Sequence, residues 1–209
     1  MPMRAFESGN FSAAPLDRAN VDTDQLIPAR FLKRPRDERY PTYLFHDIRR
    51  TEDGDLDPDF ILNRQPWNDA EVLIADRNFG CGSSREAAVY VLLDSGFRAV
   101  IAPSFGDIFY SNSMKNGFLP IRLSTEICGI LRVGIRSGQG GKVSIDLIAQ
   151  TVTGPDDQSY KFEISAFHKH CLLEGLDDIG FTLAQKTKIE EADLQRDVSM
   201  PWFKAANSI

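Results

Sequence analysis

The chain has 209 residues, a formal net charge of −6 and 26% charged residues. A net negative charge disfavours nucleic acid and anionic membranes as partners, because both select proteins with clustered Lys and Arg. No stretch approaches the roughly 20 apolar residues of a membrane helix, and the first residues lack the apolar core of a signal peptide. We therefore expect a cytoplasmic protein with a single domain over residues 1–209, since this length supports one substantial core.

Three cysteines, Cys81, Cys128 and Cys171, lie far apart in the sequence. Their spacing predicts neither a disulfide framework nor a CxxC metal site. An iron–sulfur cluster draws on about three or four closely placed thiolates, so we expect no metal or cofactor on this chain. Cys81 is either a nucleophile or a space-filling residue; a nucleophile needs a base, and no histidine has a diagnostic spacing to it.

Prolines interrupt every candidate helix in residues 1–70, so this part is predicted to be irregular and to supply loops. Within it, the segment Asn20–Pro28 places Asp22 and Asp24 on either side of a hydroxyl. One interpretation is an Asx turn. The other is that these carboxylates orient an arginine of the basic loop 30–39 toward an anionic substrate, although a solvated, mobile loop also explains that basic run.

Apolar runs and glycines alternate between residues 72 and 123 in the pattern of a βαβαβ unit. Gly96 and Gly117 stand just past two expected helices, where glycine ends helices. Parallel strands with right-handed crossovers put the loops 76–83 and 103–106 at one edge of the sheet, so the two loops can share a site. The predicted elements are a strand at 72–75, a helix at about 84–95, a strand at 98–102, a helix at about 105–116 and a strand at 119–123.

The loop Asn78–Glu86 reads Asn-Phe-Gly-Cys-Gly-Ser-Ser-Arg-Glu and combines flexible backbone with two hydroxyls, a thiol, a cation and a carboxylate. One interpretation is structural, because Ser83 and Glu86 have the spacing of a capping box. The other is a carboxylate or phosphate receptor, in which the glycines admit a ligand and Arg85 joins free N–H groups at the helix start. A P-loop is disfavoured because no Lys follows Gly82, and a dinucleotide fingerprint because Arg85 replaces its third glycine.

Two later segments, Lys142–Leu147 and Tyr160–Ile164, alternate at period two around a Gly-Pro-Asp-Asp sequence. This pattern predicts a β-hairpin or a pair of adjacent strands. Ser165 is expected to cap a short helix that Gly175 ends, and residues 186–209 to form a polar helix or loose C-terminal extension. The expected fold is therefore α/β, with a mostly parallel core and extra antiparallel strands.

Four motifs together resemble the small subunit of bacterial 3-isopropylmalate dehydratase. They are Asn20–Pro28, Asn78–Glu86, Ala102–Phe109 and His170–Gly180, in matching order between about residues 10 and 185. The resemblance implies the swivelling domain of the aconitase superfamily, a three-layer β/β/α fold. It also implies a hydro-lyase of leucine biosynthesis that isomerises 2-isopropylmalate to 3-isopropylmalate through isopropylmaleate. In that family a large subunit carries a 4Fe–4S cluster that acts as Lewis acid, so the resemblance implies activity only as a heteromeric complex.

The resemblance implies roles for residues of the glycine loop and of the Thr-Asp segment. In the superfamily the first Ser of Gly-Ser-Ser-Arg is the general base and the Arg binds a substrate carboxylate, which correspond here to Ser83 and Arg85. Ser84 belongs to the same motif and is expected to contact the substrate. Asp24 corresponds to the active-site Asp of the Thr-Asp segment.

The basic loop supplies the remaining expected substrate contacts. The family's second substrate-binding Arg follows the Thr-Asp segment by about a dozen residues, which indicates Arg36, with Arg34 as the alternative and Arg30 less favoured. The apolar Phe31 and Leu32 are expected to face the isopropyl group.

Other functions stay open at this point. A related subunit that acts on citraconate (methylmalate) or homoaconitate differs only in the loop at residues 30–36. A non-catalytic anion-binding module would use the glycine loop without any reaction. His168, His170 and Asp177 either face the large subunit or serve helix packing.

Overall fold

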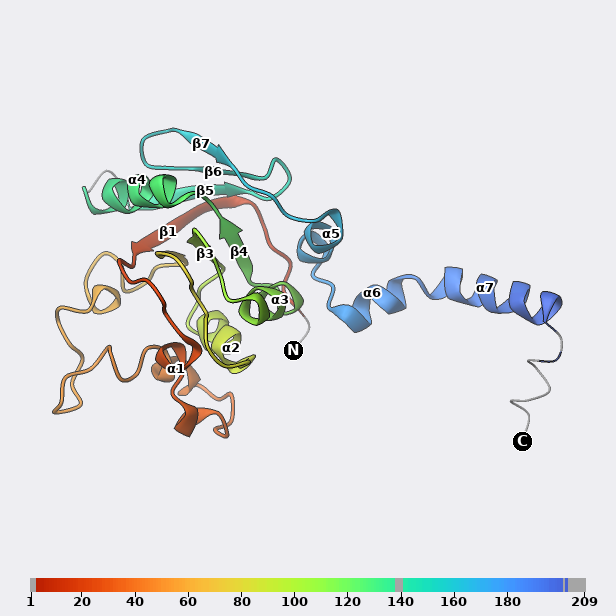
Figure 1. The fold of residues 1–209 in the computed structure, drawn as a ribbon, viewed down its shortest axis with the longest axis horizontal. Coiled ribbons are helices and arrows are strands. Elements are labelled where there is room, and N and C mark those ends of the chain that lie inside the picture. The colour runs from red at the N-terminus through yellow and green to blue at the C-terminus, as the bar shows by residue number, and fades with distance from the viewer. Residues whose placement is uncertain (1–2, 138–140, 201, 203–209) are drawn as a thin grey trace.

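A seven-stranded mixed sheet forms the centre of the computed structural model, which describes residues 3–137, 141–200 and 202 (Figure 1). The strands are β1 Gly9–Pro15, β2 Val72–Ile74, β3 Ala99–Ala102, β4 Leu119–Arg122, β5 Lys142–Asp146, β6 Thr151–Thr153 and β7 Ser159–Lys161. They lie in the order β4-β3-β2-β1-β5-β6-β7. Because β1 pairs in parallel with β2 and antiparallel with β5, it joins a parallel half to an antiparallel half. The expected α/β class, with a parallel core and added antiparallel strands, is confirmed.

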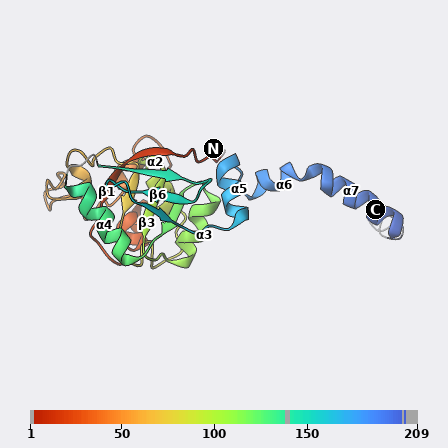
Figure 2. The same ribbon diagram turned by 90° about the horizontal axis from the view of Figure 1, so that it is seen from above.

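Helices cover both faces of the sheet and connect its parallel strands (Figures 1 and 2). The α-helices are α1 Thr23–Leu26, α2 Ala87–Asp94, α3 Asp107–Lys115, α4 Thr125–Arg136, α5 Ala166–Glu174, α6 Asp178–Ala184 and α7 Lys186–Ser199. Short 3-10 helices lie at η1 Ala29–Phe31, η2 Tyr40–Tyr43 and η3 Ile61–Asn63.

The two faces of the sheet carry separate apolar cores, because successive strand residues point to opposite sides. In β2, Leu73 packs in one buried cluster, whereas Val72 and Ile74 pack in the other. The first cluster holds α2 and the N-terminal loops against the sheet, and the second holds α4 and α5. A strand buried on both faces must be apolar throughout, which is why this segment reads as a continuous hydrophobic run.

The predicted βαβαβ unit is confirmed, with one helix boundary wrong. Its strands β2, β3 and β4 pair in parallel, and each lies close to its predicted position. Gly96 and Gly117 follow their helices with φ of +93° and +77°, the left-handed conformation that ends helices. However, α2 begins at Ala87 and not near residue 84. This difference changes the interpretation of the preceding loop.

The predicted hairpin of two strands is wrong, because a third strand lies between them. β5 pairs with β6, and β6 pairs with β7, all antiparallel. The turn at Gly154 joins β6 to β7, and its N–H donates to the carbonyl of Gln158 at 2.9 Å. β6 has three residues, too few to display an alternating pattern in the sequence.

β1 and α4 also have no counterpart among the predictions. β1 lies inside residues 1–70 and occupies the middle of the sheet, so the prediction of an irregular N-terminal part is wrong there. α4 is capped by Ser124, whose hydroxyl accepts from the N–H of Ile127, and it packs across β1, β2 and β3. Outside β1, the described part of residues 1–70 is built of loops, α1 and short 3-10 helices.

The C-terminal part contains the predicted helix and extension, with the unpredicted α6 between them. Ser165 caps α5 by accepting from the N–H of His168, and Gly175 ends it in the left-handed conformation. The expected extension forms α7, and α6 and α7 project from the body of the molecule (Figures 1 and 2). Residues 201 and 203–209 lie outside the described part. Within the described residues, no helix has the length and apolar character to cross a membrane.

Candidate active site

Three loops meet at the carboxyl edge of the parallel strands, which confirms that the loops after β2 and β3 share an edge. Asp22, after β1, forms an isolated parallel bridge with Cys81, after β2. Phe79 forms a second such bridge with Phe105, after β3. The glycine loop is therefore the central member of three adjacent segments.

Gly80 is required for packing between protein segments. Its φ is +71°, and a Cβ built there would lie 2.2 Å from Cγ of Phe109 on α3. Gly106 is equally constrained, since its Cβ would lie 2.5 Å from the carbonyl oxygen of Gly80. The interpretation that Gly80 admits a ligand is wrong, because the ring of Phe109 fills that space. At Gly82, with φ +91°, the nearest atom to a built Cβ is Cβ of Asp22 at 3.4 Å.

The predicted capping box does not form. The cap position of α2 is Glu86, which is itself in a helical conformation and makes no side-chain cap. Its Oε1 instead accepts a 2.8 Å hydrogen bond from Nδ2 of Asn116. Ser83 lies outside the helix, before the cap residue Glu86. The local spacing of Ser83 and Glu86 is overridden by contacts with residues far away in the sequence.

A ladder of hydrogen bonds joins the segment before α1 to the glycine loop. The N–H of Gly80 donates to the carbonyl of Val21 at 2.7 Å, and the N–H of Thr23 donates to the carbonyl of Cys81 at 2.9 Å. The hydroxyl of Thr23 forms the last of these hydrogen bonds by donating to the carbonyl of Ser83 at 2.9 Å. Ser83 itself is exposed. Sequence reasoning missed this bond, because nothing local to Thr23 indicates a partner 60 residues along the chain.

Arg85 and Asp24 form an ion pair inside the candidate site. The Arg85 side chain is 14% exposed and that of Asp24 is 55% exposed, so the pair is buried on its cationic side. Asp22 forms no ion pair with an arginine that the structure describes; its carboxylate accepts from the N–H of Gln25 at 2.7 Å and caps α1. The idea that the two carboxylates orient an arginine of the basic loop is therefore wrong: Asp24 holds Arg85 of the glycine loop.

The arginines of the basic loop differ in how far they are engaged. Arg30 forms an ion pair with Asp47 and lowers the pKa of that carboxyl to about 2. Arg36 forms an ion pair with Asp94 at 2.6 Å. Arg34 is exposed, and it forms no ion pair with any residue that the structure describes. Of these arginines, Arg34 has the most freedom to bind a ligand.

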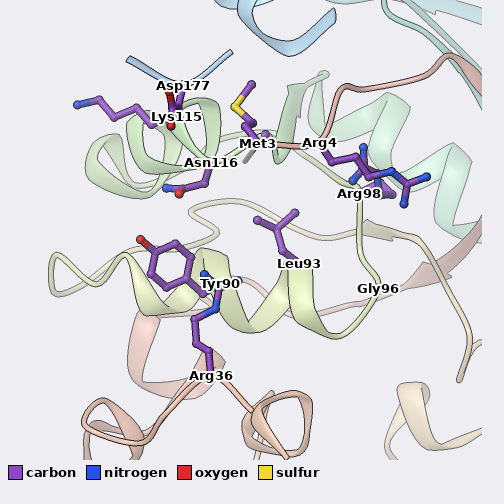
Figure 3. A pocket seen from close by; sticks show the side chains of 11 residues that line it. Met3, Arg4, Arg36, Tyr90, Leu93, Gly96, Arg98, Lys115, Asn116 and Asp177 are labelled. Carbon is purple, nitrogen blue, oxygen red and sulfur yellow. The ribbon is translucent and has the colours of Figure 1, made fainter. Parts of the chain in front are cut away.

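Arg36 lines a cavity of about 290 Å³ on the flank of α2, apart from the glycine loop (Figure 3). Its guanidinium stacks on the Tyr90 ring, 4.1 Å from the centroid, and the hydrogen bond to Asp94 raises its pKa. Lys115, also on the cavity wall, contacts Asp178 at 3.5 Å. Arg36 is thus held in the cavity wall by an ion pair and an aromatic ring.

The two apolar residues of the basic loop are placed differently. Phe31 stacks on Tyr43, with ring centroids 4.3 Å apart, and is partly buried. Leu32 is 38% exposed. Leu32 is therefore free to contact a substrate side chain, whereas Phe31 anchors the loop by its stacking on Tyr43.

The cysteines and histidines form no metal site in the part of the chain that the structure describes. Burial raises the pKa of the Cys128 thiol to about 11, and Cys171 is also buried. Burial and the nearby carboxylate of Asp22 raise the pKa of Cys81, so the geometry favours the neutral thiol over a nucleophilic thiolate. His168 lies on α5, where its Nδ1 contacts the hydroxyl of its own N-cap residue at 2.9 Å.

Comparison with known proteins gives consistent results along the chain. The model of the aconitase C-terminal domain matches residues 3–126, and the LeuD_N model matches residues 135–166. The 3-isopropylmalate dehydratase small subunit of Granulibacter bethesdensis is 51% identical over 191 residues, covering 91% of each chain. The subunit of the same name from Leptospira interrogans is 48% identical over 205 residues, covering 97% of this chain and all of that one.

A solved structure supports the same assignment. The crystal structure titled 3-isopropylmalate dehydratase from Methanocaldococcus jannaschii superposes with a TM-score of 0.62 and 28% sequence identity. The match covers 88% of this chain and 98% of the archaeal one. The fold, the family models and the close relatives agree, and the chain belongs to the family of 3-isopropylmalate dehydratase small subunits, within the aconitase superfamily.

Proposed function

We propose that this chain is the small subunit of a hydro-lyase that interconverts 2-isopropylmalate and 3-isopropylmalate through isopropylmaleate, in leucine biosynthesis. One observation carries the proposal: in a member of this family, the motif residues Asp24, Ser83 and Arg85 lie together at the carboxyl edge of the sheet. That edge is where open α/β sheets bind ligands.

The reaction assigns distinct tasks to these residues. Dehydration removes a carbon-bound proton beside a carboxylate, and Ser83 is the proposed base. A serine alkoxide is a demanding base, so it needs nearby positive charge, which Arg85 brings to the same loop. The planar guanidinium of Arg85 also matches a substrate carboxylate in two-point contact. Asp24 holds that guanidinium in place, and Ser84 is proposed to contact the substrate.

The departing hydroxyl requires a Lewis acid, and we propose that a partner chain supplies it. The described residues contain no group of three or more His, Cys, Asp or Glu that could hold a metal ion, and the described cysteines are dispersed. We assign the 4Fe–4S cluster to a large subunit, where it would polarise the leaving oxygen.

The exposure of the site also favours a partner. Ser83 and Ser84 are exposed to solvent. An alkoxide base acts well only where water is excluded, because the surrounding charges are then less screened. We propose that the large subunit covers this edge, that the chain is active only in that complex, and that the complex is cytoplasmic.

The basic loop is proposed to select the substrate. Arg34 is the arginine best placed to bind a second carboxylate, since Arg36 is held by Asp94. Leu32 is proposed to contact the isopropyl group, with Phe31 as its support. The same loop would separate this enzyme from hydratases of citraconate or homoaconitate. Hydration rates on isopropylmaleate, citraconate and homoaconitate test this: strong preference for citraconate or homoaconitate would overturn the assignment.

The base assignment is tested by Ser83→Ala in the complex with the cognate large subunit. We expect kcat for isopropylmaleate hydration to fall by about 10²–10⁴-fold, the usual contribution of one general base, with complex formation unchanged. Ser111→Ala, at an exposed serine of α3, is the matched control and is expected to keep full activity. If Ser83→Ala is as active as the control, the glycine loop belongs to a non-catalytic anion-binding module instead.

A further inference from the structure

Thr23 is a nearly fully buried hydroxyl residue next to the candidate site, with 2% of its surface exposed. A buried hydroxyl needs a hydrogen-bond partner, and this one donates to the main-chain carbonyl of Ser83 at 2.9 Å. Its backbone N–H is also engaged, with the carbonyl of Cys81 at 2.9 Å. Thr23 thus fixes the glycine loop at two points, the carbonyls of Cys81 and Ser83.

The bond to Ser83 occupies a critical place in the loop. Up to Cys81, backbone hydrogen bonds to residues 20–23 hold the chain, but α2 begins only at Ala87. Between these two supports the chain is irregular, and the Thr23 hydroxyl is the contact that fixes the Ser83 peptide. A fixed Ser83 peptide also fixes Cβ, so the hydroxyl is limited to the few staggered positions about the Cα–Cβ bond.

We propose that Thr23 is a positioning residue that holds Ser83 in the orientation required for proton transfer. The neighbouring Asp24 holds Arg85, so consecutive residues of α1 fix the proposed base and the proposed carboxylate ligand separately. This inference rests on the proposed function of Ser83. It predicts a division of effects: Thr23 controls the rate of the chemical step, and substrate binding through Arg85 is left intact.

The test is Thr23→Val, which keeps the shape of the side chain and removes the donor, in the complex with the large subunit. We expect kcat to fall by about 10–100-fold, since a displacement of about 1 Å costs roughly that much, with KM within about 3-fold of wild type. Thr23→Ser, which keeps the hydroxyl, is expected to retain most of kcat. Ser113→Ala is the matched control: it removes another buried hydroxyl, which donates to the carbonyl of Phe109 at 2.8 Å, and is expected to leave kcat unchanged.

The double variant Thr23→Val/Ser83→Ala decides whether Thr23 acts through Ser83. We expect it to be no slower than Ser83→Ala alone. The inference is overturned if the decreases in kcat of the two single variants multiply in the double variant. It is also overturned if Thr23→Val keeps wild-type kcat while Ser83→Ala is inactive. Neither result would contradict the proposed function. An active Ser83→Ala would overturn the proposed function itself. If Thr23→Val does not fold, Thr23→Cys, of similar size and with only a weak donor, makes the same comparison.

Discussion

Replacement of Gly80 by Ala should destabilise the chain far more than the same change at Gly82 or Gly96, two other glycines in the left-handed conformation. Two costs add at this position. A left-handed conformation costs an alanine about 1–2 kcal/mol. In addition, the new methyl group would lie 2.2 Å from Cγ of Phe109, and overpacking of this kind costs about 1–3 kcal/mol. The expected loss in the free energy of unfolding is therefore about 2–5 kcal/mol.

Two other glycines separate these costs. Gly96 has φ +93° and open space around a built Cβ, so Gly96→Ala carries the conformational cost alone. Gly82 has φ +91° and an ordinary contact of 3.4 Å, so Gly82→Ala should resemble Gly96→Ala. The free energy of unfolding is measured by equilibrium urea denaturation of the three variants, followed by circular dichroism. A Gly80→Ala variant within about 0.5 kcal/mol of Gly96→Ala would refute the packing argument, since that is the scatter expected for independent sites.

Three further predictions concern the charged residues and the buried thiol. Asp24→Asn leaves the largely buried Arg85 without its counter-charge and should cost about 1–2 kcal/mol in urea denaturation, less than a fully buried pair because Asp24 is 55% exposed. The exposed pair partner Asp59, changed to Asn, should cost under about 1 kcal/mol, and equal losses would contradict the difference in burial. Cys128 has a pKa raised to about 11 by burial, so the folded state keeps a proton that the unfolded state loses. The contribution of the Cys128 thiol to the free energy of unfolding is complete below the unfolded pKa and is lost as pH rises toward 11. Cys128→Ala should therefore make the free energy of unfolding decline less steeply over this pH range. An unchanged dependence of stability on pH would contradict this prediction. Arg34→Ala should raise KM by about 10-fold, as for loss of one charged hydrogen bond, whereas Arg36→Ala should leave KM near wild type and lower stability instead. The reverse pattern in steady-state kinetics would return the substrate contact to Arg36.

The central part of the fold was predictable because its signals are local. β2 and β3 are continuous apolar runs, since both of their faces are covered. Gly96 and Gly117 end helices through a backbone conformation that favours glycine. β1 escaped prediction because small residues and a terminal proline fill it, and its identity as a strand depends on partners elsewhere in the chain.

In the candidate site, the motifs were visible but the partners within them were not. The spacing of Ser83 and Glu86 fits a cap, yet Glu86 accepts a hydrogen bond from Asn116, the C-cap residue of α3. Asp24 lies near several arginines in the sequence and pairs with Arg85. In both cases the nearest partner in space is distant along the chain, and periodicity or spacing carries no information about such contacts.

The central position of β1 has a consequence for the order in which the molecule assembles. β1 is the first strand to be synthesised, and its parallel partner β2 lies about 60 residues further along the chain. Its other partner, β5, begins only at Lys142. A nascent chain that has completed the parallel half therefore presents β1 as an unpaired edge strand, the kind of surface that associates with other chains. The edge of β1 is covered only when β5, in the last third of the polypeptide, has been synthesised and pairs with it.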